Sequence, residues 1–192
     1  MAETRRPDIA DAAIRVIARD GLRGLTHRAV DRELSIAIGS TSYYARTRRE
    51  LMDMVVRRLS ERTSDDVAHS SAPLPRTSAG LAKALAAVTE QVIARTADSR
   101  ARLALAIDLV DDPELHSLMT DGAPVRELLL SGARAGLEAL GVARPERHAI
   151  DLVTILDGLV YHRLAGPGVR GDRADAERML TAYLTGLPRA DG

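Results

Sequence analysis

The chain of 192 residues lacks cysteine, phenylalanine and tryptophan altogether, and it contains only four tyrosines. Without cysteine, disulfide bonds and thiolate chemistry are excluded. No run of about 18 apolar residues occurs, so no segment is predicted to cross a membrane. The N-terminus also lacks the apolar stretch of a signal peptide. We therefore expect a cytoplasmic protein that does not associate with membranes.

Residue patterns that are typical of catalysis are also missing. The five histidines show no H-x-x-x-H metal spacing, and neither a glycine-rich phosphate loop nor a nucleophile elbow is found. Asp111 and Asp112 precede Pro113 and are interpreted as a polar turn. We predict no enzymatic activity, no catalytic residue, no cofactor and no metal site.

Signals that start and stop helices are frequent, whereas strand signals are rare. Pro7 lies in the first turn of an amphipathic stretch that ends at Gly21. Thr26 can cap a second short helix. Thr47 and Glu50 have the spacing of a capping box and open a long helix. Since the apolar residues are nearly all aliphatic, which suits helix packing, we predict an all-α fold.

More helices are predicted after a loop over residues 68–77, whose prolines and small polar residues are typical of a linker. They span residues 78–95, 99–110, a short turn from 113, and residues 124–140, 145–165 and 173–187.

Charge is divided unevenly along a chain whose net charge is zero. Residues 1–63 contain 13 basic and 9 acidic side chains, a net charge of +4, and the remainder contains 14 and 18, a net charge of −4. This asymmetry favours a basic binding module joined to an acidic one.

Three short helices are predicted before residue 47, the third at about 38–44, and this spacing is typical of a helix-turn-helix. Such a motif inserts its second helix into the major groove of DNA. Ser40, Thr41 and Ser42 can bond base edges or phosphates, and Tyr43 can bond phosphate. The alternative interpretation is a solvated loop with half-buried tyrosines. Because neighbouring residues on a helix point about 100° apart, at least one of Tyr43 and Tyr44 is expected to pack inward.

Residues 6–60 resemble the DNA-binding domain of the tetracycline-repressor (TetR) family. The resemblance lies in GLRGLTHRAV (residues 21–30) and in GSTSYYARTRREL (residues 39–51), and more loosely in LVDDPELHSLM (residues 109–119). It implies a helix-turn-helix domain over residues 1–47, followed by a helical-bundle domain for ligand binding and dimerisation over residues 48–192. It also implies a homodimeric transcription regulator, usually a repressor, that a small ligand releases from a palindromic operator in double-stranded DNA.

The resemblance also assigns roles to individual residues. Thr26 and Arg28 should contact phosphate, and Tyr44 and Arg48 should hold the DNA backbone. His27 is expected to be exposed beside them, either as a DNA-binding residue that contacts phosphate or as a solvated surface histidine. The residues expected to face the groove are Ile38, Gly39, Ser40, Thr41, Ser42 and Tyr43.

Three positions depart from the family pattern. Ser35 stands where the family usually has glycine, Ala37 stands at the usual cap of the recognition helix, and Ala45 replaces a core phenylalanine. These departures support an alternative function, a helical dimeric partner module that has lost sequence-specific DNA binding.

The last two long helices, over residues 145–165 and 173–187, are predicted to form the homodimer interface, because the first is apolar on more than one side. Polar residues within apolar helices indicate the site of a small lipophilic effector. The ligand-binding candidates are Arg102, Leu103, Ile107, His116, Met119, Thr154, Asp157 and Tyr161; a surface or interface role is the alternative for the polar members.

Overall fold

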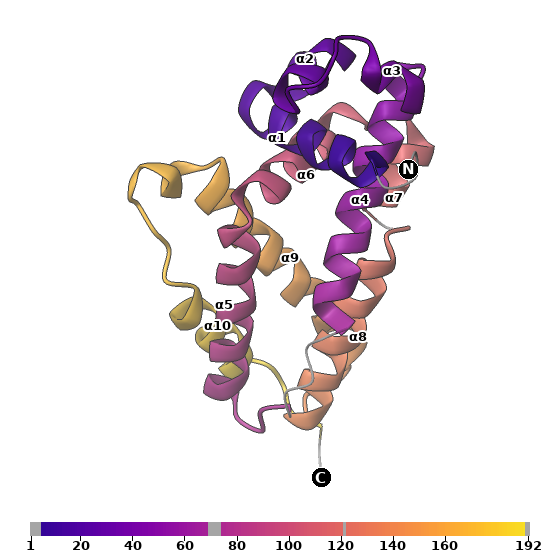
Figure 1. Ribbon diagram of the computed structural model, residues 1–192. Helices are drawn as coiled ribbons and strands as arrows, with labels where there is room; N and C mark the ends of the chain where they lie inside the picture. Colours follow the sequence, from indigo (N-terminus) through magenta and orange to yellow (C-terminus); the bar gives the residue numbers. More distant parts are fainter. Residues whose placement is uncertain (1–4, 69–73, 121, 191–192) are drawn as a thin grey trace. The chain divides into compact units, whose positions relative to one another are not determined.

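The computed structural model describes residues 5–68, 74–120 and 122–190, which form helices joined by short connections (Figure 1). The predicted all-α fold is confirmed. Within the described residues, the one extended pairing is an isolated bridge between Val142 and Arg189, and none of their helices is long and apolar enough to cross a membrane. The helices are α1 (Arg6–Gly24), α2 (His27–Glu33), α3 (Ser40–Tyr44), α4 (Arg48–Ala68), α5 (Ser78–Ala94), α6 (Thr96–Asp108), α7 (Pro113–Met119), α8 (Pro124–Ala139), α9 (Pro145–Leu164) and α10 (Ala176–Thr185), with a 3₁₀ turn η2 (Pro167–Arg170).

The chain divides into two compact units. Unit 1 comprises Met1–Asp66 and Thr96–Val125, and unit 2 comprises Val67–Arg95 and Arg126–Gly192. Unit 1 therefore contains α6 and α7 together with the N-terminal helices, and α6 packs along α1. The contacts within the chain therefore do not divide it after residue 47, where we predicted a domain boundary. The predicted boundary separates the DNA-binding part from the ligand-binding and dimerisation part, and it stays a prediction. Residues 69–73 of the predicted loop lie outside the described residues.

The predicted helix signals of unit 1 operate as expected. The Thr26 hydroxyl accepts a hydrogen bond from Ala29 N at 3.1 Å and caps α2. Thr47 Oγ1 accepts from Glu50 N at 3.1 Å, while the Glu50 carboxylate accepts from Arg46 N at 2.7 Å, so the capping box reaches one residue further back than the usual form. Gly21 has φ 70° and interrupts α1, as its predicted role as a stop requires.

Unit 1 is held together by an aliphatic core and by charges between its helices. The Asp11 carboxylate accepts from Arg58 and pairs with Arg62, both at 2.8 Å, and Arg62 also pairs with Asp98 of α6 at 2.8 Å. α1, α4 and α6 are thereby joined. A fully buried leucine or isoleucine contributes about 2 kcal/mol. The largest fully buried side chains here are Ile9, Ile14, Ile17, Leu25, Leu51, Leu59, Leu105 and Leu115.

Unit 2 packs α5, α8, α9 and α10 around a second aliphatic core. Thr77 caps α5 by accepting from Gly80 N at 3.1 Å. Arg163 of α9 binds both carboxylate oxygens of Glu90 on α5, at 2.7 and 3.1 Å. The largest fully buried side chains of this core are Leu137, Leu152, Leu180 and Leu184.

Candidate DNA-reading surface and regulatory helices

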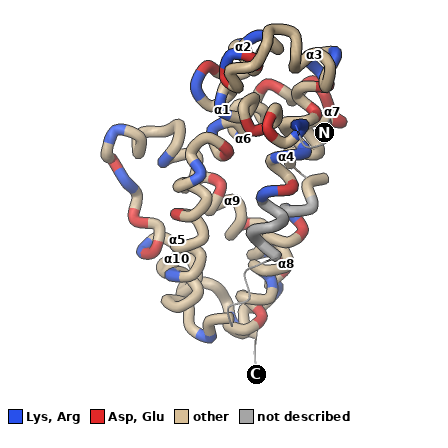
Figure 2. Tube along the Cα trace, viewed as in Figure 1, with Lys and Arg blue, Asp and Glu red and all other residues tan. Residues whose placement is uncertain are grey.

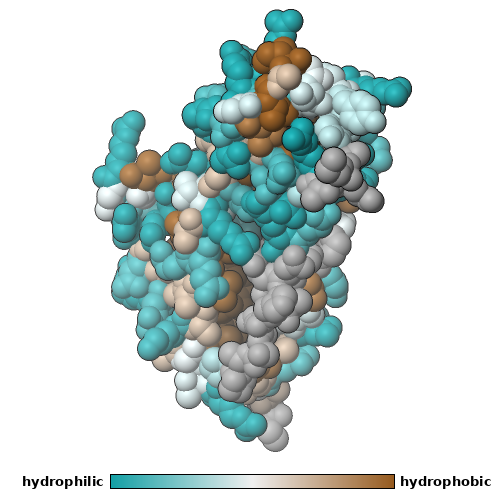
Figure 3. All heavy atoms as spheres, viewed as in Figure 1, coloured by the Kyte–Doolittle hydropathy of each residue, from teal (hydrophilic) through white to brown (hydrophobic). Residues whose placement is uncertain are grey.

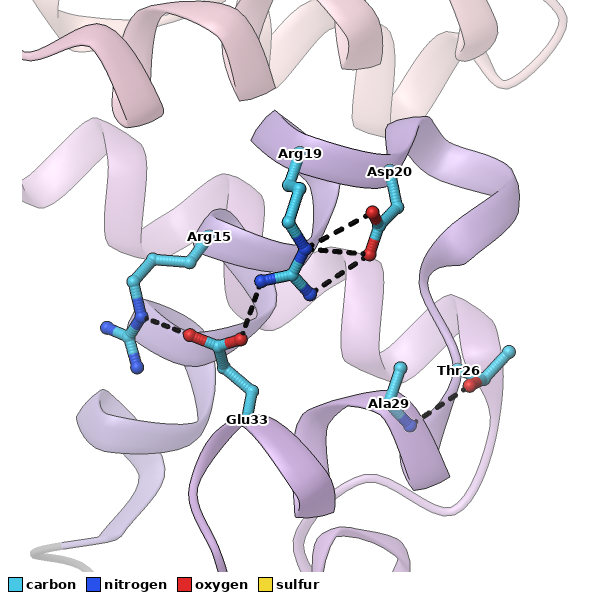
Figure 4. Close-up of polar contacts among 6 residues, drawn as sticks. All are labelled: Arg15, Arg19, Asp20, Thr26, Ala29 and Glu33. Carbon is cyan, nitrogen blue, oxygen red and sulfur yellow. Dashed lines mark hydrogen bonds and ion pairs between the residues drawn. The ribbon is translucent and has the colours of Figure 1, made fainter.

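Two arginines of α1 fix the position of α2. Arg15 and Arg19 donate to the two carboxylate oxygens of Glu33 at 2.8 and 2.9 Å, and Arg19 also pairs with Asp20 at 3.0 Å (Figure 4). The hydrogen bonds from Arg15 and then Arg19 lower the pKa of the Glu33 carboxyl. Since Glu33 is the last residue of α2, the end of that helix is tied to α1 just before the turn into α3.

The turn between α2 and α3 uses two left-handed residues. Ser35 has φ 53°, and Gly39 has φ 97°. A left-handed backbone favours glycine, which explains physically why a glycine would suit position 35. Gly39, not Ala37, is the N-cap of α3, and its left-handed conformation keeps residues 38 and 39 out of the helix. α3 is therefore shorter than the predicted 38–44.

The start of α3 is held by a buried carboxylate. Asp31 of α2 is fully buried, and it accepts from Gly39 N at 2.7 Å, from Thr41 N at 2.8 Å and from Thr41 Oγ1 at 2.6 Å. Burial by itself raises the pKa of Asp31, but the hydrogen bonds from Thr41 and Gly39 outweigh it, and the net effect is a lowered pKa. Sequence reasoning missed Asp31; its only signal was an acidic residue among the apolar positions of α2.

α3 presents one set of side chains outward and another inward. Ser42 is exposed and Tyr43 is 78% exposed, as expected for residues that face a groove. Thr41 is fully buried against Asp31, so the prediction that it faces the groove is wrong. Tyr44 is half-buried and packs on the core of unit 1, which confirms that one tyrosine packs inward. The Ser40 hydroxyl donates to Ala37 O at 2.6 Å and closes the turn.

The end of α3 is held by His27, the first residue of α2. His27 Nε2 lies 2.7 Å from the carbonyl oxygen of Ala45, the C-cap of α3. His27 is half-buried, so the expectation of an exposed side chain is wrong. The Ala45 side chain is fully buried, and the site accommodates it in place of a larger residue.

A surface groove of about 420 Å³ runs along the side of α2 and α3. Its lining residues are Thr26, His27, Arg28, Asp31, Ile38, Gly39 and Ser42. All of them except Asp31 are among the predicted DNA-binding residues, so the structure brings these together. Ile38 is 60% exposed, and Figure 3 shows an apolar patch within a hydrophilic surface at the α2–α3 end of unit 1.

Figure 2 shows basic residues around α2 and α3. The side chains of these arginines have different partners. Arg48 is exposed and donates to the carbonyl oxygens of Leu22 and Leu25; its predicted contact with the DNA backbone stays a prediction. Arg49 pairs with Asp112 and with Glu114, the latter at 2.7 Å. Within the described parts of the chain, Arg28 and Arg46 have no acidic partner at ion-pair distance, and both are exposed. Arg46 is not among the predicted site residues, although it lies close to Arg48 and Arg49 in the sequence.

The ligand-binding candidates are divided between the two units. In unit 1, Arg102 donates to Leu59 O at 2.9 Å, Met119 is buried in the core and Ile107 is 71% exposed. Leu103 and His116 are half-buried there. In unit 2, Thr154, Asp157 and Tyr161 lie exposed along one side of α9. A shared pocket for these residues stays a prediction.

Residues 76–186 match the family of tetracyclin repressor-like C-terminal domains, and this match covers more than half of the chain. The chain belongs to the TetR family. It is a TetR-family transcriptional regulator with a DNA-binding helix-turn-helix, which α2, the turn and α3 form. Comparison with curated protein sequences finds no significant match.

Solved structures with the same fold cover nearly all of this TetR chain. A TetR-family protein from Streptomyces coelicolor is 29% identical with a TM-score of 0.66, over 94% of this chain and 96% of that one. The multidrug-binding protein EbrR, in complex with ethidium, is 28% identical with a TM-score of 0.64, also over 94% and 96%. A transcriptional regulator from Rhodococcus sp. has a TM-score of 0.76 at 21% identity, over 97% and 99%, which shows the common fold.

Proposed function

We propose that this protein is a homodimeric repressor that binds a palindromic operator and is released from it by a small lipophilic effector. The observation that carries the proposal is the surface of α3. Ser42 and Tyr43 are exposed there beside the groove, while the inward residues of the same helix are fixed to α2 and to the core. A rigidly held helix with outward polar side chains suits the reading of base edges in the major groove.

Contacts to the DNA backbone are assigned to Arg28 and Arg46, two exposed cations that have no acidic partner at ion-pair distance within the described residues. Arg28 lies in the first turn of α2, close to the Thr26 cap, and Arg46 lies just after α3. The two arginines therefore flank the reading side chains in the sequence. Phosphate contacts of this kind supply affinity and orientation, whereas Ile38, Ser42 and Tyr43 supply sequence preference. We assign Arg48 a different role, since its guanidinium already binds two carbonyl groups at the end of α1.

The homodimer is proposed to form through α9 and α10, as the sequence predicts for residues 145–165 and 173–187. Three large side chains are partly exposed on these helices: Ile150 (51%), Tyr161 (53%) and Met179 (40%). Gly158 lies between the first two on α9, and open space surrounds it. Exposed apolar area beside a glycine favours close approach of a second helix.

A lipophilic effector is proposed because the chain offers aliphatic side chains and no phenylalanine or tryptophan for stacking. EbrR, which is 28% identical, was solved in complexes with ethidium and with malachite green. These dyes are suitable first probes for this protein. The predicted ligand-binding residues other than Tyr161, which is assigned here to the dimer interface, remain the candidates for its effector site.

The experiment is a gel-shift titration with a duplex selected by the protein, comparing wild type with Tyr43→Ala and with Tyr43→Phe. We expect Tyr43→Ala to weaken binding at least tenfold, Tyr43→Phe to have a smaller effect, and both variants to remain dimers. Because ethidium also intercalates into duplex DNA, dye binding is measured with the protein alone, and a dye that occupies the effector site should bind it in the absence of DNA. Equal binding of selected and random duplex by wild type would instead favour the partner module without sequence-specific DNA binding.

A further inference from the structure

α3 is a single helical turn of five residues, too short to be stable in isolation. Its N-cap is a glycine, so no side chain next to it in sequence satisfies its first amide groups. Its outward residues can read DNA only if something else fixes the rotation and tilt of the helix. Tyr44 packs on the core of unit 1, and the hydrogen bonds that hold the two ends of α3 come from one face of α2.

The first contact is Asp31, which acts as a helix cap supplied from another helix. Its two carboxylate oxygens accept from Gly39 N and Thr41 N, which belong to the cap and first turn of α3, at 2.7 and 2.8 Å. The Thr41 hydroxyl adds a third bond at 2.6 Å. Because Thr41 points at Asp31, the next residue, Ser42, points about 100° away, towards the groove.

The second contact is His27, at the opposite end of α3. It lies four residues before Asp31, so the two side chains are on the same face of α2. His27 Nε2 donates to Ala45 O, a carbonyl group at the end of α3 that would otherwise lack a partner within the helix.

We propose that His27 and Asp31 are positioning residues, which clamp the two ends of the recognition helix and set which side chains face DNA, without touching DNA themselves. The proposal rests on the proposed function, and it replaces the expected direct roles of His27 and Thr41. It predicts that damage to the clamp weakens the reading of every base that α3 contacts, because the whole helix loses its orientation.

The test compares Thr41→Val, which removes one hydrogen-bonding hydroxyl at nearly constant shape, with Thr41→Ser, which keeps it. Binding is measured to the selected operator, to random duplex, and to operators with each base pair substituted in turn. We expect Thr41→Val to lower the ratio of operator to random affinity at least fivefold and to flatten the preference at all positions read by α3. Thr41→Ser should restore most of that ratio. A loss confined to one base pair would mean that Thr41 reads DNA directly and would overturn the proposal.

A second measurement needs no DNA and therefore stays valid even if wild type shows no preferred duplex. Amide hydrogen exchange at Gly39 and Thr41 is followed in wild type and in Asp31→Asn. Asparagine at position 31 would have only one acceptor oxygen, and its NH2 group would face one of the two backbone N–H groups. That N–H group would lose its hydrogen bond, so exchange at Gly39 or Thr41 should accelerate at least tenfold. Amides of α1 should change little. Unchanged protection at both residues would contradict the clamp, as would equal acceleration throughout unit 1.

Discussion

Replacing Gly158 by arginine separates the stability of the subunit from that of the dimer. In the single chain, Gly158 is exposed on α9, and no neighbouring atom lies within 4 Å of the point that a β-carbon would occupy, so a side chain fits without a clash. Arginine is also a better helix former than glycine by about 1 kcal/mol. The variant subunit should therefore fold with its helix content retained.

The dimer should respond in the opposite direction. If α9 meets its symmetry mate near Gly158, a twofold axis places two guanidinium groups in one buried contact. Burying unpaired charges costs several kcal/mol, and a cost of about 3 kcal/mol already raises the dimer Kd more than a hundredfold. Operator affinity should fall with it, because one short reading helix per subunit binds weakly without its partner.

Gly132 of α8 supplies the matched control, since it is also exposed and free of neighbours within 4 Å of its β-position. Sedimentation equilibrium and dilution gel filtration of Gly158→Arg and Gly132→Arg measure the two dimer constants. We expect dissociation of the first variant alone. Dissociation of Gly132→Arg with a tight Gly158→Arg dimer would refute the assignment of the interface to α9 and move it to α8.

Four other predictions concern unit 1 and α10. Ser35→Gly should stabilise unit 1 by about 0.5–1 kcal/mol in urea melts, because it relieves a left-handed residue, whereas Ser35→Ala should not. The exposed apolar side chain of Ile38 should contact a thymine methyl group of the operator. Replacing that thymine by deoxyuridine should therefore weaken binding of wild type, but it should not weaken binding of Ile38→Ala. Arg46→Gln should reduce the slope of the logarithm of operator affinity against the logarithm of salt concentration by about 0.9 per half-site. Arg48→Gln should instead lower thermal stability. Equal slopes for wild type and Arg46→Gln would contradict the assigned phosphate contact. Burial, with Asp151 nearby, raises the pKa of Tyr183 to about 12. The protonated phenol therefore stabilises the folded state below pH 10, and this contribution is lost as the pH rises from 10 to 12. In Tyr183→Phe the free energy of unfolding should lack that decline.

Helix positions were predictable because local chemistry determines them. The Thr26 cap, the capping box at Thr47 and Glu50 and the break at Gly21 depend on residues within four positions of one another, and the structure shows all of them. The left-handed conformation at Ser35 was not predicted; only the family resemblance marked this position, since the family usually has glycine there.

Side-chain direction within α3 was not predictable to the same degree. Five residues are too few for a periodic pattern to show that Thr41 points inward and Ser42 outward. The partners that decide it are distant in sequence: Asp31 lies 10 residues before Thr41, and Arg48 reaches back 26 residues to Leu22. Such contacts depend on how α1, α2 and α4 pack, which composition and spacing do not specify.

The most direct test of a palindrome-reading repressor is selection of random duplex DNA by the purified wild-type protein at moderate salt, followed by sequencing. Two symmetry-related copies of α3 should enrich an inverted repeat whose half-sites lie about one helical turn, or about 10 base pairs, apart. The clamp on α3 predicts that the preference is strong and covers several adjacent base pairs in each half-site. Enrichment of no sequence, or of a single site without inverted symmetry, would contradict a homodimer that reads a palindrome.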